Sequence, residues 1–168
     1  AIAREHALQE GVTENEYQVG SLHSEGIIVD AMIGTGLKTQ LRPEYQNAVC
    51  DINRSGLPVL AIDLPTGLNA DTGEVAGDAI KANHTITFVE NKRGFFTASG
   101  PDFVGDLKVN TLGLRESGFS KVVPNSYRLD LDALLLECGP RKYESHKGTF
   151  GSVLIVGGNY NMGGAVAL

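Results

Sequence analysis

The sequence predicts an α/β fold with a mainly parallel sheet. Apolar runs rich in β-branched residues, bounded by glycine or proline, occur at 26–34 and 57–65, and each reads as a buried strand. Between them, residues 42–56 show the apolar spacing of a helix. Strand, helix and strand in this order are typical of parallel strands joined by a helical connection.

Local signals place the boundaries of the helices. Apolar side chains near the start of the chain fit one helical face, and Gly11 ends that helix. Pro43 suits the first position of the second helix, and Gly56 suits its end. The predicted buried face of this second helix consists of Tyr45, Ala48, Val49 and Ile52.

Two further strands complete the predicted sheet. Residues 78–90 read as a short helix followed by a third strand, and 104–114 as a fourth, more polar strand. Polar turn residues and a proline at 116–126 then indicate a linker. We therefore expect one α/β domain over residues 1–122 and the start of a second over 123–168.

The second unit begins with a helix and continues into a glycine-rich junction. Residues 127–139 place Leu131, Leu134, Leu135 and Cys138 on one helical face. A basic loop at 141–151 leads into a closing strand, SVLIV, and a helix is predicted to open near Asn161. Because this helix has barely begun at residue 168, and the first helix lacks a preceding strand, we expect an internal piece of a longer two-domain protein.

Composition excludes several classes of protein. The net charge of −6 and the lack of a lysine/arginine block argue against a nucleic-acid partner. No run of 18 apolar residues is present, and the first residues do not read as a signal peptide, so we expect a cytoplasmic protein without a membrane partner. The two cysteines read as reduced thiols, and neither they nor the four histidines have metal-ligand spacing.

Two acids follow the first two predicted strands. Asp30 precedes a loop containing Gly34, Thr35 and Gly36, and Asp63 precedes a loop containing Thr66 and Gly67. In open α/β sheets ligands bind beyond the carboxyl ends of the strands, so both acids are candidates to line one crevice. The glycines would let backbone N–H groups approach a phosphate or sugar. The alternative is that each acid is a helix cap or turn former.

Other candidate residues have equally ordinary explanations. Lys92 and Arg93 could reach an anion in the same crevice or be a solvated pair, whereas Phe95 and Phe96 are expected in the core. The helix start near 161–164 could hold a large ligand, contacted by His146 and Lys147, or could be a site of close helix–strand packing.

These motifs together resemble a known family. The strings VDAMIGTGL, AIDLPTGLNADTG and ANHTITFVENKRG resemble the NAD(P)HX epimerase domain, and HKGTFGSVLIVGGNYNMGGA resembles the start of the kinase-like NAD(P)HX dehydratase domain. Their order is similar to that in bifunctional NAD(P)H-hydrate repair enzymes. The resemblance implies a Rossmann-like α/β/α epimerase domain, represented by its C-terminal part, followed by the start of a ribokinase-like α/β domain.

The resemblance also implies an activity. The family repairs hydrated NADH and NADPH: the epimerase interconverts the R and S forms of NAD(P)HX, and the dehydratase removes water from the S form at the expense of ADP or ATP. A potassium ion in the epimerase would be held by Asp30 and Thr66. The family usually has serine at the position of Thr66, and threonine keeps the hydroxyl group. The resemblance implies no oligomeric state, although a homo-oligomer is possible.

The resemblance assigns the remaining site residues. The hydrated nucleotide would contact Asp63 and, in the dehydratase, Ala165. It would also contact the loop made of Gly34, Thr35, Gly36, Leu37, Lys38, Thr39 and Gln40. Asp63 is the candidate general base or acid, because epimerisation requires proton transfer during loss and readdition of water or during ring opening.

The family's asparagine- and glycine-rich phosphate loop should precede residue 1, and the dehydratase's catalytic aspartate should follow residue 168. We therefore expect the chain alone to catalyse neither reaction and its full-length parent to catalyse both. Two alternatives remain open: a ribokinase-class kinase of small molecules, suggested by the closing segment, and a nucleotide-binding module without catalysis.

Overall fold

The fold is described from a computed structural model. The structure describes residues 2–37, 40–75, 77–114, 123–124, 126–137, 143–146, 148–152, 154–161 and 163–164. The chain divides into two compact units, Ala1–Pro124 and Asn125–Leu168, and each is considered by itself.

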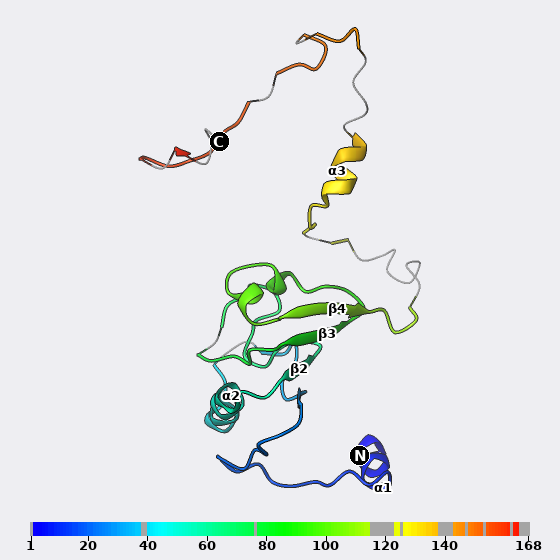
Figure 1. Ribbon diagram of the computed structural model, residues 1–168, viewed down its shortest axis with the longest axis vertical. Coiled ribbons are helices and arrows are strands. Elements are labelled where there is room, and N and C mark those ends of the chain that lie inside the picture. Colours follow the sequence, from blue (N-terminus) through cyan, green and yellow to red (C-terminus); the bar gives the residue numbers. More distant parts are fainter. Residues whose placement is uncertain are drawn as a thin grey trace. The chain divides into compact units, whose positions relative to one another are not determined.

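The first unit is built on a four-stranded parallel sheet. Its strands are β1 (Ile28–Asp30), β2 (Val59–Ile62), β3 (His84–Phe88) and β4 (Asp106–Asn110), and they are hydrogen-bonded in this order. Figure 1 shows β2, β3 and β4 side by side. The predicted parallel α/β fold is therefore confirmed. Because the strands are parallel and in chain order, all four carboxyl ends lie at one edge of the sheet.

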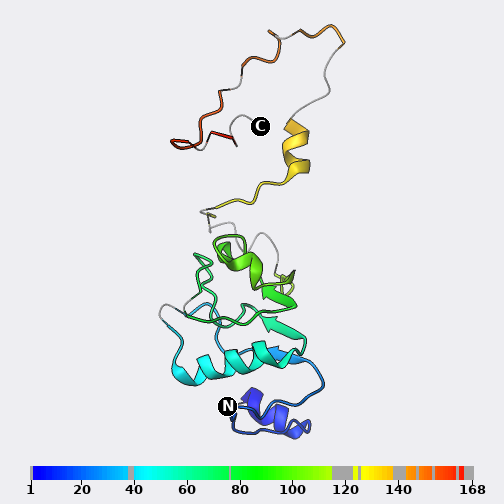
Figure 2. The ribbon, with the colours of Figure 1, turned by 60° about the vertical axis from the view of Figure 1, so that its left-hand side comes forward.

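Helix α2 (Pro43–Ser55) packs along the sheet (Figure 2). Pro43 is its first residue, and Gly56 ends it in the left-handed conformation, with φ of 70°, as predicted. Ala48, Val49 and Ile52 are buried, and the last two share a core cluster with Val59 of β2. Tyr45 packs against the same cluster but is only partly buried.

The expectation that 26–34 forms a fully buried strand is wrong. The strand itself is short, and the side chains of Ile27 and Val29 are 71% and 58% exposed. Alternate residues of a strand point to opposite faces. Ile28 therefore packs toward the α2 side, while the described residues leave the opposite face of β1 uncovered.

The short helix expected at the start of 78–90 is also absent, although β3 follows as predicted. The backbone N–H groups of this segment are used by other parts of the chain. Ile80 N donates to Thr66 O, Ala82 N donates to Phe103 O, and Asn83 N donates to Val59 O. A helix would have required these donors for its own turns, so the segment instead ties the loops to the sheet.

A second core cluster lies beneath the loops. It contains Leu64, Leu68, Phe95 and Val104. Two short 3₁₀ helices, η1 (Arg93–Phe95) and η2 (Gly100–Asp102), form part of this region. The prediction that both phenylalanines are core residues holds only for Phe95, which is 1% exposed, because Phe96 is 40% exposed.

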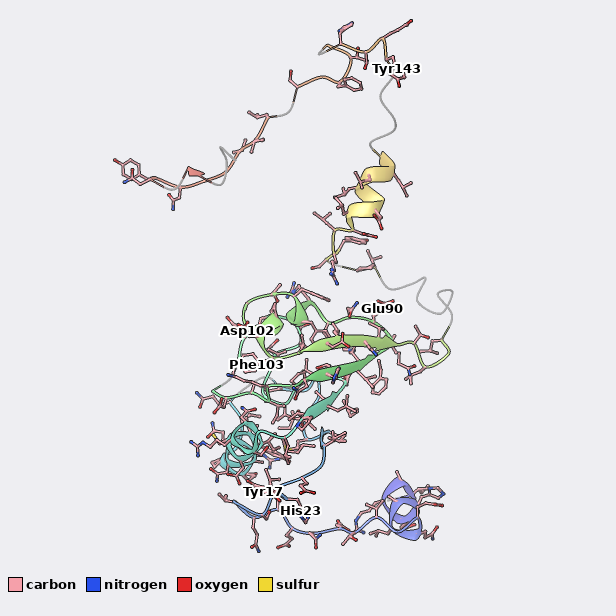
Figure 3. All side chains as sticks on the ribbon, in the orientation of Figure 1. Tyr17, His23, Glu90, Asp102, Phe103 and Tyr143 are labelled. Atoms are coloured by element: carbon pink, nitrogen blue, oxygen red, sulfur yellow. The ribbon has the colours of Figure 1, made fainter. Side chains whose placement is uncertain are left out.

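The segment before β1 is anchored to α2 rather than buried. Helix α1 (Ile2–Gln9) has no buried residue. Farther along, the Tyr17 hydroxyl donates to Asp51 Oδ2 at 2.7 Å, and Gly20 N donates to the same oxygen at 2.7 Å. Tyr17 and His23, labelled in Figure 3, belong to this connecting segment.

The second unit contains helix α3 (Leu131–Glu137), which confirms the predicted helix in its central part. Leu131, Leu134 and Leu135 are exposed, and Cys138 lies outside the described residues. The expected closing strand is not formed by residues 151–152 and 154–161. A strand must pair its backbone with a neighbour, and the described part of this unit contains no other strand.

No helix among the described residues is both long and apolar enough to cross a bilayer.

Candidate functional site

Asp30 and Asp63 lie at the same edge of the sheet. Asp30, the last residue of β1, is paired with Ala61 of β2, and Asp63 follows two residues later. The expectation that both acids stand at the carboxyl ends of neighbouring strands is therefore correct. Figure 3 shows Glu90 at this end of the sheet and Asp102 and Phe103 at the other.

The Asp30 carboxylate is buried and held by three hydrogen bonds. Only 1% of the Asp30 surface is exposed. Thr66 N donates to Oδ2 at 2.8 Å, while Thr66 Oγ1 and Met32 N donate to Oδ1 at 2.7 and 3.3 Å. No lysine, arginine or histidine of the described residues forms an ion pair with it. Buried carboxylates are normally paired with a cationic group or bind a metal, so this side chain is a candidate cation ligand.

Thr66 places further oxygen atoms beside Asp30. Its hydroxyl accepts a hydrogen bond from Ile33 N at 3.1 Å and lies 3.4 Å from the carbonyl oxygen of Ile33. A threonine hydroxyl has one proton and two lone pairs. With that proton directed to Asp30 and one lone pair used by Ile33 N, one lone pair remains. Asp30, Thr66 and Ile33 thus offer carboxylate, hydroxyl and carbonyl oxygens of the kind that hard cations bind.

Asp63 is held through one of its two carboxylate oxygens. Thr87 Oγ1 and Phe88 N donate to Oδ1 at 3.1 and 3.2 Å, and Lys92 Nζ lies 3.0 Å from the same atom. Oδ2 accepts no hydrogen bond from a described residue. It faces Gly34, where an added methyl carbon would lie 4.0 Å away. The loop after β1 and the acid after β2 are therefore neighbours.

The environment of Asp63 favours its ionised form. Burial by itself raises the pKa of this carboxyl group, but the hydrogen bond from Lys92, the bonds from Phe88 N and Thr87, and the charge of Lys92 together lower the pKa below its ordinary value. At neutral pH the group is a carboxylate, which can accept a proton or a hydrogen bond but has no proton to donate. This favours the base over the acid in the pair of roles predicted for Asp63.

Two strained turns adjoin this site at the ends of β2 and β3. Asp63 has a φ of 68° and Val89 a φ of 71°. Each is the centre of a three-residue turn, closed by Leu64 N donating to Ile62 O and by Glu90 N donating to Phe88 O. Such turns are rare, and a positive φ is a true outlier for a β-branched residue. Strain of this kind costs about 1–3 kcal/mol and concentrates at functional sites.

The loop that follows β1 is open where a ligand would need space. Thr35, Gly36 and Gln40 are exposed, and no atom lies within 4 Å of a methyl group added at Gly36. Leu37 instead packs against the first core cluster and anchors the loop. Lys38 and Thr39, also predicted to contact the substrate, lie outside the described residues.

Gly67 has a structural reason to be glycine, whereas its predicted approach to a ligand stays a prediction. Its φ is +99°, and an added methyl carbon would lie 2.2 Å from the carbonyl oxygen of Asp78. The glycine is needed because the loop after β2 crosses the 78–83 segment at backbone contact distance.

Lys92 and Arg93 are both engaged with the protein. The Lys92 ammonium donates to Phe88 O and Glu90 O at 2.9 and 3.1 Å in addition to its contact with Asp63. Arg93 Nε donates to Asp71 O at 2.6 Å. Lys92 is thus not a free anion-binding group but a partner of Asp63. Thr87 also contacts Asp63, but the sequence did not predict it as a site residue. The sequence offers only one hint, namely a threonine within a predicted strand.

The second unit shows no assembled site among its described residues. Ala165, Lys147 and Met162 lie outside them. His146 Nδ1 accepts a hydrogen bond from Gly148 N within its own loop. No cluster of histidine, cysteine or acidic side chains with the geometry of a metal site occurs in the part of the chain that the structure describes.

The sheet and its edge define the class of protein. An open parallel sheet, with polar loops and acids at the carboxyl ends of adjacent strands, has the arrangement of ligand-binding α/β domains. A model of the family described as YjeF-related protein N-terminus matches residues 3–94, more than half of the chain. The chain therefore belongs to the YjeF N-terminal family.

Curated relatives extend the match. The bifunctional NAD(P)H-hydrate repair enzyme of Coxiella burnetii is 43% identical over 84% of this chain and 29% of that protein. The enzymes of the same name from Escherichia coli and Leishmania braziliensis are 34% and 37% identical, each over 100% of this chain and 32% of the relative. The chain thus spans about a third of the length of these relatives.

Proposed function

We propose that this chain forms part of an NAD(P)HX epimerase domain, which interconverts the R and S forms of hydrated NADH and NADPH. The observation that carries the proposal is the pairing of a buried carboxyl group, Asp30, which has no ion pair with a described residue, with an ionised and partly exposed one, Asp63, at adjacent strand ends. Membership in the YjeF N-terminal family and the printed names of the relatives support it.

Asp30 and Thr66 would hold a potassium ion, together with the carbonyl oxygen of Ile33. The residues fit this cation because they present oxygen atoms only and because the Asp30 charge has no partner among the described residues. When bound, potassium would neutralise this buried charge. The protein contributes rigidity: Thr66 N and Met32 N fix the carboxylate, and Ile33 N fixes the hydroxyl.

Asp63 would act on the hydrated nicotinamide ring. Its Oδ1 is committed to Thr87, Phe88 and Lys92, so Oδ2 is the atom available to a ligand beside Gly34. A carboxylate there can accept the proton of the ring hydroxyl as that hydroxyl becomes a carbonyl group and the ring C–N bond breaks with its electron pair passing to nitrogen, and it can return the proton when the ring closes on the other face. If epimerisation instead runs through loss of water, the same carboxylate can accept a proton from the water that adds back to the other face. The backbone at Gly34 and Gly36 would lie against the nucleotide.

The second unit would be the start of the dehydratase domain. Support comes from the relatives that match the whole chain and are named as bifunctional enzymes. In this proposal the complete domain is ribokinase-like and removes water from the S form with ADP or ATP as phosphoryl donor, and Ala165 contacts the hydrated nucleotide.

The test is an epimerisation assay on this chain and on a form extended on both sides to the length of its relatives. Purified R or S NADHX is incubated with each protein in potassium or sodium buffer of equal ionic strength, and the epimers are separated by chromatography. The expected result is interconversion by the extended form, faster in potassium, and dehydration of the S form only when ADP or ATP is added. An extended form that leaves both epimers unchanged would overturn the proposal.

A further inference from the structure

We propose that Lys92 is a positioning residue for this epimerisation: its ammonium group holds Asp63 by Oδ1 and so directs Oδ2 toward the Gly34 loop. The inference rests on the function proposed above, and it assigns to Lys92 a role that goes beyond an anion-binding or solvated side chain.

The ammonium group of Lys92 is fully used inside the protein. A lysine has three N–H donors, and three acceptors surround this one: Phe88 O at 2.9 Å, Glu90 O at 3.1 Å and Asp63 Oδ1 at 3.0 Å. Its side chain is only 18% exposed. A flexible lysine on the surface would lose much conformational freedom in such an arrangement, so the three bonds fix a single geometry.

The same contacts distinguish the two oxygens of Asp63. Oδ1 has three partners, whereas Oδ2 has none among the described residues and faces Gly34. Rotation of the carboxylate would break all three contacts of Oδ1. The protein thus presents one defined oxygen atom of Asp63 toward Gly34.

Lys92 also links the two turns with positive φ. Asp63 is at the centre of the turn after β2, and Val89 is at the centre of the turn after β3. The carbonyl groups of Phe88 and Glu90, which flank Val89, both accept from Lys92. One ammonium group therefore fixes the unusual turn after β3 and the acid on the neighbouring strand, as expected of a group that preorganises a reactive atom.

The test is a double-mutant cycle on epimerisation in the extended form. It compares Lys92→Met, Asp63→Asn and the double variant with wild type. Misplacement of a reactive group by about 1 Å costs up to about 100-fold, so we expect Lys92→Met to lower kcat roughly 10- to 100-fold with little change in KM. In the Asp63→Asn background the same change should have almost no effect, because Lys92 acts through Asp63.

Two further variants complete the experiment. Lys92→Arg keeps the charge and should recover most of kcat, and Lys108→Met removes an exposed lysine on β4 and should match wild type. A Lys92→Met enzyme with wild-type kcat, or equal losses in both backgrounds, would overturn the inference.

Failure of the proposed function has a different result, namely that the wild-type extended form does not interconvert the epimers. The same cycle is then measured by denaturant unfolding of the 168-residue chain. If the two substitutions are coupled, so that the unfolding equilibrium constant of the double variant differs severalfold from the product of the single effects, Lys92 does hold Asp63. If the effects of the two substitutions on stability simply add, the inference is refuted.

Discussion

Thr66 Oγ1 lies 2.7 Å from Asp30 Oδ1, and the backbone N–H of the same threonine donates to Oδ2 at 2.8 Å. One residue thus binds both oxygens of a buried carboxylate 36 positions earlier in the chain. The two loops that follow β1 and β2 are joined at this point. The arrangement of these two loops therefore depends on a hydroxyl group that bonds both Asp30 and Ile33.

Removal of that hydroxyl should destabilise the chain. Thr66→Val keeps the shape but removes the hydroxyl donor of Asp30 Oδ1 and the acceptor of Ile33 N, which should cost about 2–4 kcal/mol. Thr66→Ser keeps the hydroxyl and removes one buried methyl group, which should cost about 1 kcal/mol. Urea unfolding monitored by circular dichroism measures both. Equal losses of stability in the two variants would mean that the hydroxyl contributes nothing.

Potassium should stabilise the folded chain through Asp30. A ligand that binds only the folded state adds about 2.7 kcal/mol when its concentration is 100 times its Kd, so the melting temperature should rise with added KCl. Choline chloride at the same ionic strength serves as the control for screening. The Asp30→Asn variant should lose the difference between the two salts, because it lacks the carboxyl group that would hold the ion. A difference that survives in this variant would place the cation elsewhere.

Two glycines in the loops after β1 and β2 should differ strongly in their response to the same substitution. Gly67→Ala would bring a methyl group against Asp78 O at positive φ, and the conformational and packing costs together should be roughly 2–5 kcal/mol. Gly36→Ala meets open space, so its effect on unfolding should be within about 0.5 kcal/mol. In the extended form, Gly36→Ala should instead raise the KM for the hydrated nucleotide. A stable Gly67→Ala chain would contradict the close approach.

The stability of the chain should depend on pH through Asp63. Because the pKa of Asp63 is lowered in the folded state, its contribution is present above the unfolded pKa of about 3.9 and is lost as pH falls through the folded pKa. Lys92→Met removes the main lowering cause, so the variant should have less of this contribution to lose. Unfolding free energies measured from pH 7 downward should converge for wild type and variant at low pH. Curves that stay parallel would show that Lys92 does not act on Asp63.

The order of elements and the two acids were predictable because their signals are local. Apolar β-branched runs, a helix beginning at Pro43 and a stop at Gly56 are each encoded within a few residues. The positions of Asp30 and Asp63 at one edge then follow from the geometry of parallel strands alone. This is why the prediction that the two acids lie close together is confirmed, although they are far apart in the sequence.

The contacts between loops were not predictable, because they depend on where distant backbone groups lie. The 78–83 segment reads as a short helix, but its N–H groups donate to distant residues, namely Asn53, Val59, Thr66 and Phe103. In the same way, nothing in the letters around Lys92 reveals that its acceptors are two carbonyl groups and Asp63. The strain at Val89 is equally hidden, since valine is a normal strand residue.

That strain leads to a prediction with an internal control. Val89→Gly removes a β-branched residue from a position with positive φ. The relief of backbone strain, about 1–2 kcal/mol, should offset two losses: the packing of the valine side chain and the greater freedom of glycine in the unfolded chain. Val109→Gly makes the same chemical change within β4, where there is no such strain to relieve, and should cost about 1 kcal/mol or more. Thermal and urea unfolding of both variants would measure the difference. If Val89→Gly destabilises the chain as much as Val109→Gly does, the positive φ of Val89 carries no energetic strain, and Lys92 has no strained turn to hold in place.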